Sequence, residues 1–165
     1  MADIFCDALR APGPEAELEP YGWLIGSWAL EVTEFLPDGG TRRRAGEWHF
    51  ARVLEGRAIQ DVWIVPPRGL RGGGEAEYFG TTLRMPDPTG AWHIHYADPV
   101  RRFAISMVGR REGAEIVQFG TDAAGNRRRW RFSDITPEAF RWRGEVLAAD
   151  GSWHCQTDFT ARRTG

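Results

Sequence analysis

Asp61 is the residue whose type and setting in this sequence come closest to acid–base chemistry. It lies in the run 59–65, where Asp61 and Trp63 fall on the same side of an extended chain. If Trp63 points into a core, Asp61 points there too, and a buried carboxylate pairs, accepts several hydrogen bonds or has a raised pKa. Three interpretations stay open: a structural hydrogen bond, a role in orienting a ligand or moving a proton, and an outward Asp61. The predicted partners of an inward Asp61 are Tyr96, Thr81 and Thr157.

Histidine is the other residue type that could carry chemistry here. The sequence contains His49, His93, His95 and His154. His93 and His95 stand two apart on one strand face, a spacing that some metal sites use. All four histidines alternate with aromatic residues, however, so we expect them on the outer face of the sheet. We therefore predict no metal and no cofactor, with a zinc site and haem ligation by one histidine as the alternatives.

Several other kinds of site find no support in the sequence. It has no Gly-x-Ser-x-Gly nucleophile elbow, no phosphate-binding glycine motif and, because all 21 basic residues are arginine, no lysine for Schiff-base chemistry. The formal net charge of −2 provides no field that would steer nucleic acid. Two arginine runs, 42–44 and 127–129, each lie beside a turn. We interpret them as solvated strand ends rather than as a phosphate or carboxylate clamp.

Cysteine usage and hydropathy bear on the compartment. Cys6 and Cys155 form neither a disulfide framework nor a Cys-x-x-Cys pair. Residues 1–9 contain two aspartates and no long apolar segment, which argues against a signal peptide. No apolar run approaches the roughly 18 residues of a membrane-spanning helix. We therefore expect a cytoplasmic protein without a membrane or nucleic-acid partner.

The elements that must position these residues are short strands. From residue 21 onward, runs of about 8–12 residues rich in aromatic and β-branched side chains alternate with turn residues, a pattern typical of an antiparallel barrel or sandwich. The predicted strands are 26–36, 44–54, 57–66, 77–85, 91–98, 102–110, 114–121, 127–134, 139–148 and 152–162. Short connections favour an all-β, up-and-down antiparallel barrel of about ten strands. Residues 1–20, punctuated by three prolines, are predicted to form an arm or short helix that caps one end of a barrel domain spanning 21–165.

Tryptophan is the residue that this pattern concentrates on one side of the sheet. The chain has 8 tryptophans, and alternation in the strands separates aromatic residues from charged ones. Because an unpaired buried row of arginine or glutamate would cost several kcal/mol per ion, the aromatic face must be the interior. The tryptophans expected to point inward are Trp48, Trp63, Trp92, Trp130, Trp142 and Trp153. They either fill the barrel or line a cavity, and the pattern leaves both open.

Gly26-Ser27-Trp28, at the start of the first strand, resembles the Gly-x-Trp motif of the calycin superfamily, which contains the lipocalins and fatty-acid-binding-protein-like barrels. In that superfamily an arginine of the last strand lies across this tryptophan, which implies that Arg162 or Arg163 does so here. Longer stretches, such as residues 50–57, 60–64, 80–92 and 130–153, resemble bacterial lipocalin-like families of unknown function (the DUF1579-like group). Nitrobindin-like haem barrels are more distant relatives by analogy.

These observations predict a protein that binds a small apolar, aromatic molecule in a tryptophan-lined barrel cavity. The predicted ligand-binding residues are Asp61, Trp63, Trp92, Tyr96, Trp130, Trp142 and Trp48. One alternative is a small isomerase, hydratase or lyase in which Asp61 is the acid or base beside Tyr96. A second is a haem-binding barrel of nitrobindin type. The expected partner is a small molecule, and a homodimer stays open.

Overall fold

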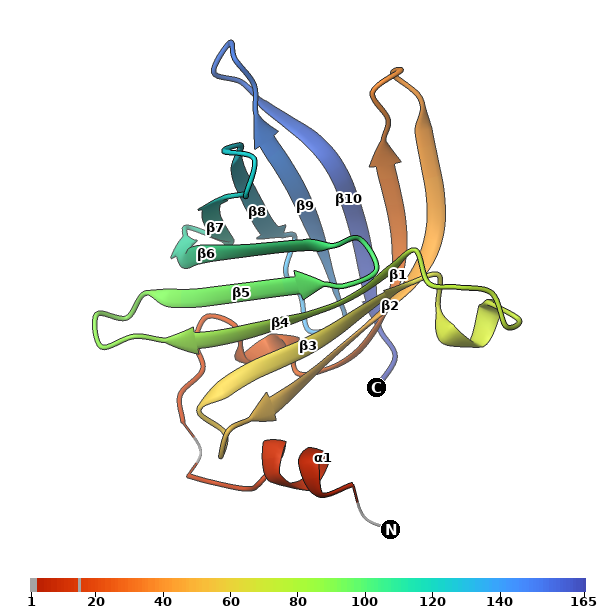
Figure 1. Ribbon diagram of the computed structural model, residues 1–165. Coiled ribbons are helices and arrows are strands. Elements are labelled where there is room, and N and C mark those ends of the chain that lie inside the picture. The colour runs from red at the N-terminus through yellow and green to blue at the C-terminus, as the bar shows by residue number, and fades with distance from the viewer. Residues whose placement is uncertain (1–2, 15) are drawn as a thin grey trace.

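The computed structural model describes residues 3–14 and 16–165, and these residues form one closed β-barrel (Figure 1). Within them, ten strands follow one another around the barrel, each pair of neighbours is antiparallel, and β10 pairs with β1 to close the ring. The strands are β1 (Gly26–Phe35), β2 (Thr41–Val53), β3 (Ala58–Val65), β4 (Tyr78–Pro86), β5 (Trp92–Asp98), β6 (Phe103–Glu112), β7 (Glu115–Thr121), β8 (Arg127–Ser133), β9 (Ala139–Leu147) and β10 (Trp153–Arg163). The predicted all-β, up-and-down barrel is confirmed.

The two ends of the barrel differ. Because the strands are antiparallel, the turns after β1, β3, β5, β7 and β9 lie at one end, which we call the mouth. The turns after the even-numbered strands lie at the other end, the base. Figure 1 shows the β1–β2 and β9–β10 turns at the top and helix α1 (Ile4–Leu9) at the bottom. The turn after β3 is long and contains the 3-10 helix η2 (Arg68–Leu70).

Alternation along the strands separates core from surface as expected. In β5, for example, Trp92, Ile94 and Tyr96 are buried, whereas His93 is half-buried and His95 is exposed. The same rhythm buries Trp48 and Phe50 in β2 and Phe140 and Trp142 in β9, among others. The tryptophans Trp48, Trp63, Trp92 and Trp142 are all at most 8% exposed. The barrel interior is therefore an aromatic core.

Trp153 is an exception to the predicted inward set. A β-bulge between Cys155 and Thr157 shifts the register of β10 against β9. The extra residue reverses the alternation, so Phe159 is buried inside while Trp153 and Cys155 lie on the outer face. Trp153 is half-buried there, with the Arg129 guanidinium 4.5 Å from its ring centroid. The prediction that Trp153 points inward is wrong for this reason.

The base is closed by the segment that leads into β1. Leu18, Tyr21 and Leu24 are each at most 3% exposed. Tyr21 directly precedes the 3-10 helix η1 (Gly22–Leu24), and Leu24 is the last residue of that helix. Helix α1, in contrast, has no buried residue. It stays near the base through the hydrogen bond that the Leu54 amide donates to the Leu9 carbonyl, at 2.9 Å.

Arg163 fastens this closed end. Its guanidinium carbon lies 4.1 Å from the ring centroid of Trp28, and its N–H groups donate to the carbonyls of Trp23, Ile25 and Pro137 at 2.7–2.9 Å. The Trp28 indole N–H donates to the Leu24 carbonyl at 2.8 Å. Of the two arginines that the resemblance allowed, Arg163 is the one across the tryptophan.

Gly26 must be glycine for the same contact. Its φ of +129° disfavours any residue with a Cβ, and a Cβ built there would lie 2.6 Å from the Arg163 Nη1 atom. Gly26 therefore leaves room for the Arg163 guanidinium, and Trp28 stacks against it.

Among the helices that the structure describes, none is both long enough and apolar enough to span a membrane.

Arg163→Ala is expected to lower the free energy of unfolding by about 2 to 3 kcal/mol, because three charge-assisted hydrogen bonds and the stacking on Trp28 are lost together. Urea unfolding followed by tryptophan fluorescence measures this. Arg162→Ala is the matched control: Arg162 is exposed on the outer face, and we expect a change within about 0.5 kcal/mol. Equal losses for the two variants would contradict the assigned role of Arg163.

Candidate functional site

The mouth of the barrel holds a cavity of about 420 Å³. Six aromatic residues from six different strands form much of its wall: Trp63, Tyr78, Tyr96, Phe103, Trp130 and Trp142. Phe35 and Leu36, at the β1–β2 turn, also line it and are 44% and 37% exposed. The cavity is thus an aromatic hollow with an apolar rim, and its volume is within the range of small-molecule sites.

Below this cavity the barrel is almost filled. A void of about 20 Å³ shares Trp63, Tyr96, Trp130 and Trp142 with the mouth cavity. Deeper, Trp142 stacks on Phe159 with ring centroids 4.6 Å apart, and Trp48 meets Trp142 edge-on at 6.2 Å. The sequence left open whether the aromatic residues fill the barrel or line a cavity. They do both, because the mouth is hollow and the base is packed.

The structure brings together only part of the predicted ligand-binding set. Trp63, Tyr96, Trp130 and Trp142 line both spaces, and Trp48 lines only the void. Trp92 lies at the base, where its indole N–H donates to the Glu19 carbonyl at 2.9 Å and its ring meets Tyr21 edge-on at 4.9 Å. Trp92 belongs to the closure of the base rather than to the cavity.

Two glycines make room for these rings. A Cβ on Gly144 would lie 2.7 Å from the ring of Trp142, and one on Gly80 would lie 2.4 Å from the Tyr96 hydroxyl oxygen. Both glycines face the interior beside the mouth cavity, on β9 and β4. The cavity wall therefore depends on small residues as much as on large ones.

Asp61 points inward and is 1% exposed, but it lines neither space. Its carboxylate pairs with the Arg84 guanidinium, which is itself completely buried, and accepts a hydrogen bond from the Thr82 amide at 3.1 Å. None of the predicted partners Tyr96, Thr81 and Thr157 hydrogen-bonds this carboxylate, although the Thr81 hydroxyl donates to the Asp61 backbone carbonyl at 2.6 Å. Burial raises the pKa of Asp61, and the positive charge of Arg84 acts in the opposite direction. Asp61 is thus committed to an ion pair inside the core.

The sequence did not predict that Arg84 points inward, because the alternation of aromatic and charged residues assigns arginines to the outer face. It occupies the inner face of β4 in the same alternation as Tyr78 and Thr82. Aromatic rings surround its guanidinium, with the centroids of Phe50, Tyr21 and Phe132 at 5.5–5.9 Å. Asp61 was the one signal in the sequence for a buried cation, since an inward carboxylate requires a cation or several hydrogen-bond donors nearby.

Tyr96 presents its hydroxyl at the mouth. It donates to the Asp98 carboxylate at 3.1 Å, and the other Asp98 oxygen accepts from the Val100 and Arg101 amides at 2.9 and 3.1 Å. Burial, together with the negative charge of Asp98, raises the pKa of Tyr96. Tyr96 is therefore a neutral phenol whose proton is already engaged by the β5–β6 turn.

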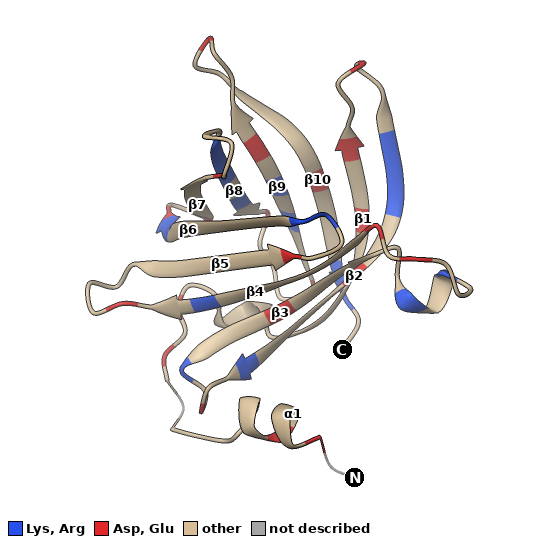
Figure 2. Ribbon diagram, in the orientation of Figure 1, with Lys and Arg blue, Asp and Glu red and all other residues tan. Residues whose placement is uncertain are grey.

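Charged side chains ring the mouth, contrary to the view of the arginine runs as merely solvated strand ends. Figure 2 shows the basic start of β2 beside the acidic end of β1. Glu34, only 6% exposed, pairs with Arg42 at 2.9 Å and with Arg44 at 2.7 Å. Arg44 and Arg101 lie over the Tyr78 ring, at 5.2 and 4.3 Å from its centroid. Arg42 thus lines the mouth cavity, and Arg44 pairs with Glu34, which also lines it.

Arg128, from the second arginine run, also lines the mouth cavity. It donates to Asp122 at 2.8 Å and also contacts the Gln156 side chain. Asp122 also accepts from the amides of Ala124 and Asn126 at 3.0 and 2.9 Å, which closes the β7–β8 turn. Burial opposes ionisation of Asp122, but the contacts from Asn126 and Arg128 outweigh it and lower its pKa to about 2.

The four histidines lie on the outer face, as predicted. His49 contacts Ser27 and Glu47, His93 contacts Asp87, His95 contacts Ser106 and His154 contacts Ser152, each at 2.9 Å. Within residues 3–14 and 16–165, no three His, Cys, Asp or Glu side chains come together in a way that could hold a metal ion.

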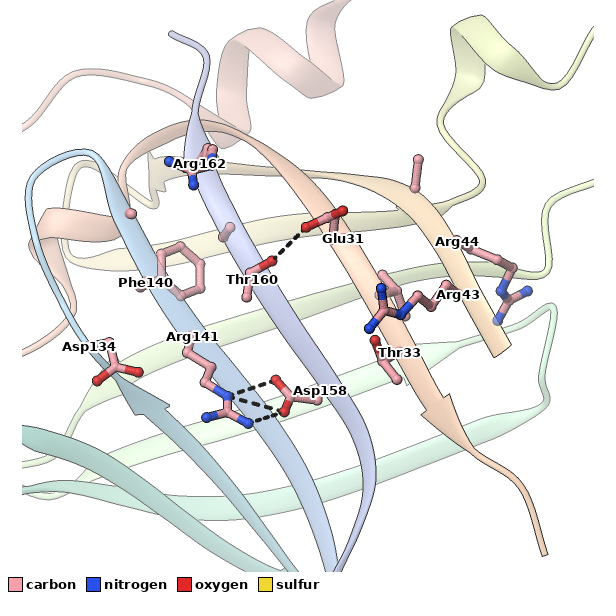
Figure 3. Close-up of a pocket in the computed structure, with 14 residues that line it drawn as sticks. Glu31, Thr33, Arg43, Arg44, Asp134, Phe140, Arg141, Asp158, Thr160 and Arg162 are labelled. Carbon is pink, nitrogen blue, oxygen red and sulfur yellow. Dashed lines mark hydrogen bonds and ion pairs between the residues drawn. The ribbon is translucent and has the colours of Figure 1, made fainter. Parts of the chain in front are cut away.

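A second, larger hollow of about 760 Å³ lies on the outside of the barrel, over β1, β2, β9 and β10 (Figure 3). Its wall is charged and polar, with Glu31, Arg43, Arg162 and the hydrogen-bonded pair Arg141–Asp158. The Arg141 side chain is 40% exposed, and the Glu31 carboxylate accepts a weak hydrogen bond from Thr160 at 3.4 Å. We therefore place the candidate site at the mouth rather than here.

The ion pair in the core predicts a characteristic mutational pattern. Asp61→Leu or Arg84→Met alone leaves a buried charge unpaired, and each is expected to lower the free energy of unfolding by about 3 to 5 kcal/mol. The double variant should be more stable than either single variant, because no isolated charge remains. Urea unfolding of the three proteins measures this, and strictly additive losses would contradict the pairing.

The lowered pKa of Asp122 predicts a loss of stability in acid. An Asp in an unfolded chain titrates near 3.9, so its ionised form stabilises the fold above about pH 4, and this contribution disappears as the pH falls toward 2. Asp122→Asn should therefore be less stable than the original protein at pH 7 and equally stable near pH 2. Urea midpoints across this range measure it, and a stability difference independent of pH would contradict it.

No family model matches this chain, and no curated protein matches its sequence. Solved structures do match its fold. The crystal structure of Rv2717c from M. tuberculosis has a TM-score of 0.65 and 15% identity over 93% of this chain and 99% of that one. The S-type phycobiliprotein lyase CPES from Guillardia theta has a TM-score of 0.60 and 11% identity over 88% and 90%. A redesigned barrel, mFAP1, bound to DFHBI matches with a TM-score of 0.43 and 16% identity over 86% and 95%. At these identities, the first two matches show that the chain has the fold of known antiparallel barrels.

Proposed function

We propose that this protein binds a small, flat, largely apolar molecule in the cavity at the mouth of its barrel. The observation that carries the proposal is the aromatic wall of that cavity, formed by side chains such as Trp63, Trp130 and Trp142 around about 420 Å³. Flat aromatic molecules gain from offset or edge-on contacts with such rings in addition to the burial of apolar surface. Phe35 and Leu36 at the rim provide apolar surface along the entrance.

The polar residues of the predicted site take different roles in this proposal. Tyr96 lines the cavity and is the polar side chain closest to the expected anchor role. Asp61 is a positioning residue, because its carboxylate holds Arg84, and Arg84 lines the void beneath the cavity. A lipocalin-like, calycin-type classification and a bacterial, cytoplasmic setting form part of the same proposal. The Arg163–Trp28 contact supports the classification.

The two alternatives have weaker support in the geometry. An isomerase, hydratase or lyase that used Asp61 would need this carboxylate at the cavity, but it is paired with Arg84 behind the wall. A haem barrel that used a histidine would need that side chain inside, but all four histidines lie on the outer face and hydrogen-bond there. The single function that the cavity supports best is ligand binding.

The test is titration with N-phenyl-1-naphthylamine, a neutral aromatic dye whose fluorescence rises in apolar surroundings. We expect saturable binding at one site per chain, and Thr157→Phe should weaken it at least tenfold, because Thr157 lines the cavity and a phenyl ring there would occupy it. A tenfold change corresponds to about 1.4 kcal/mol of binding free energy.

The matched control lies on the same strand. Thr160→Phe adds the same ring to the outer face of β10, where Thr160 is exposed, and should leave the dye affinity unchanged. Thermal unfolding of both variants checks that the barrel is intact. Absence of saturable binding by the original protein, or equal weakening by both variants, would overturn the proposal.

A further inference from the structure

Several buried nitrogen atoms below the mouth cavity lack a hydrogen-bond partner. Within the described residues, the indole N–H groups of Trp63 and Trp142 and the Nε–H of Arg84 are buried and have no hydrogen-bond partner, whereas the Trp48 indole faces the Asp61 carboxylate. The side chains of Trp63, Trp142 and Arg84 are at least nine-tenths buried, and all three line the same void of about 20 Å³. Three orphaned donors at one place are unusual, since most buried polar groups are paired.

The orphaned groups share one chemical property, which is that each can only donate. Indole and guanidinium nitrogens carry hydrogens and no available lone pair. The Asp61 carboxylate is engaged by Arg84, by the Thr82 amide and by the Trp48 indole, and the Tyr96 hydroxyl faces Asp98. An apolar ligand in the mouth would leave every one of these donors without a partner, whereas a ligand with an acceptor would gain their hydrogen bonds.

Water does not fully resolve this imbalance. The void has the size of about one water molecule, and a water oxygen accepts at most two hydrogen bonds. Its own two hydrogens would then need acceptors, and among the described side chains that line the void only the hydroxyls of Thr82 and Tyr96 can accept. An oxygen atom that carries no hydrogen and is attached to a flat skeleton fits better, because it brings lone pairs without adding donors.

We infer that the ligand of the mouth cavity carries a carbonyl or carboxylate oxygen at its inner end, and that this oxygen enters the void beside Trp63 and Trp142. This inference rests on the proposed function and specifies its ligand class. The flat carbon skeleton occupies the mouth cavity, which shares Trp63 and Trp142 with the void. Arg84, held by Asp61, forms the floor that faces this oxygen.

The test compares naphthalene derivatives of nearly equal shape by isothermal titration calorimetry. The acceptor ligands are 2-acetylnaphthalene and 2-naphthoate, the apolar isostere is 2-isopropenylnaphthalene, and the donor-only ligand is protonated 2-(aminomethyl)naphthalene. We expect at least one acceptor ligand to bind about tenfold or more tightly than the apolar isostere. The ammonium ligand should bind more weakly than that acceptor ligand and more weakly than the isostere. Whether the ketone or the carboxylate binds better distinguishes a neutral acceptor from an anionic one.

The origin of this preference is tested by removing one N–H. Trp142→Phe keeps an aromatic ring beside the void but has no N–H, so the affinity ratio of the preferred acceptor ligand to the isostere should fall about threefold to tenfold. Trp153→Phe makes the same change on the outer face and should leave the ratio unaltered. A thermal unfolding midpoint for each variant shows that the barrel persists.

The outcomes separate the two proposals. If both the isostere and the acceptor ligands bind with the same affinity, the cavity binds ligands and the inference about the oxygen is overturned. Tight binding of the ammonium ligand overturns it as well. If no naphthalene derivative binds, both the inference and the proposed function fail.

Discussion

The interior of a closed ten-stranded barrel sets the problem that the rest of this structure addresses. Closing the sheet satisfies every strand edge, but a ring of ten strands encloses more space than a ring of eight, whose interior ordinary side chains just fill. Aromatic residues supply the missing volume. Trp28, Trp92 and Phe132 pack at the base, and Trp48, Trp142 and Phe159 pack above them. The abundance of tryptophan is therefore a consequence of closure.

The packing stops before it reaches the mouth, and the reason is local. The charged residues Glu34, Arg42 and Arg44 occupy inward positions at the rim and compensate one another, and the rings of Trp142 and Tyr96 lie against the wall beside Gly144 and Gly80. At the base, by contrast, the segment around Tyr21 and Leu24 enters the barrel as a plug, which Arg163 fastens. One barrel thus combines a rigid closed end with a hollow open end, an arrangement well suited to holding a small molecule.

Much of the fold follows from local sequence patterns, because alternation and turn residues act over a few positions. They were sufficient for the ten strands, the aromatic interior and the outward histidines. Features that depend on contacts between different strands could not be predicted from these local patterns. The Asp61–Arg84 pair joins β3 to β4 through a register that alternation does not determine, and an inward arginine looks like a surface residue in sequence. The bulge in β10, which turns Trp153 outward, depends on how that strand meets β9. Of the candidate site, the aromatic wall was predictable, whereas its division into a mouth and a packed base was not.

The pairing of β10 with β1 has a further consequence for how the chain reaches its native state. The other nine pairs join neighbours in the sequence, but this seam joins Trp28 to Arg163 and Val32 to Phe159, across almost the whole domain. A nascent chain therefore exposes one long unpaired edge on β1 until residues 153–163 have been synthesised, and such edges recruit other chains. Because this seam closes the longest loop in the chain, its formation has the highest loop-closure entropy cost of the ten pairings. Glu31 and Thr33 are polar residues on the outer face of β1, which is otherwise rich in apolar side chains. They would oppose aggregation through that unpaired edge before the barrel closes.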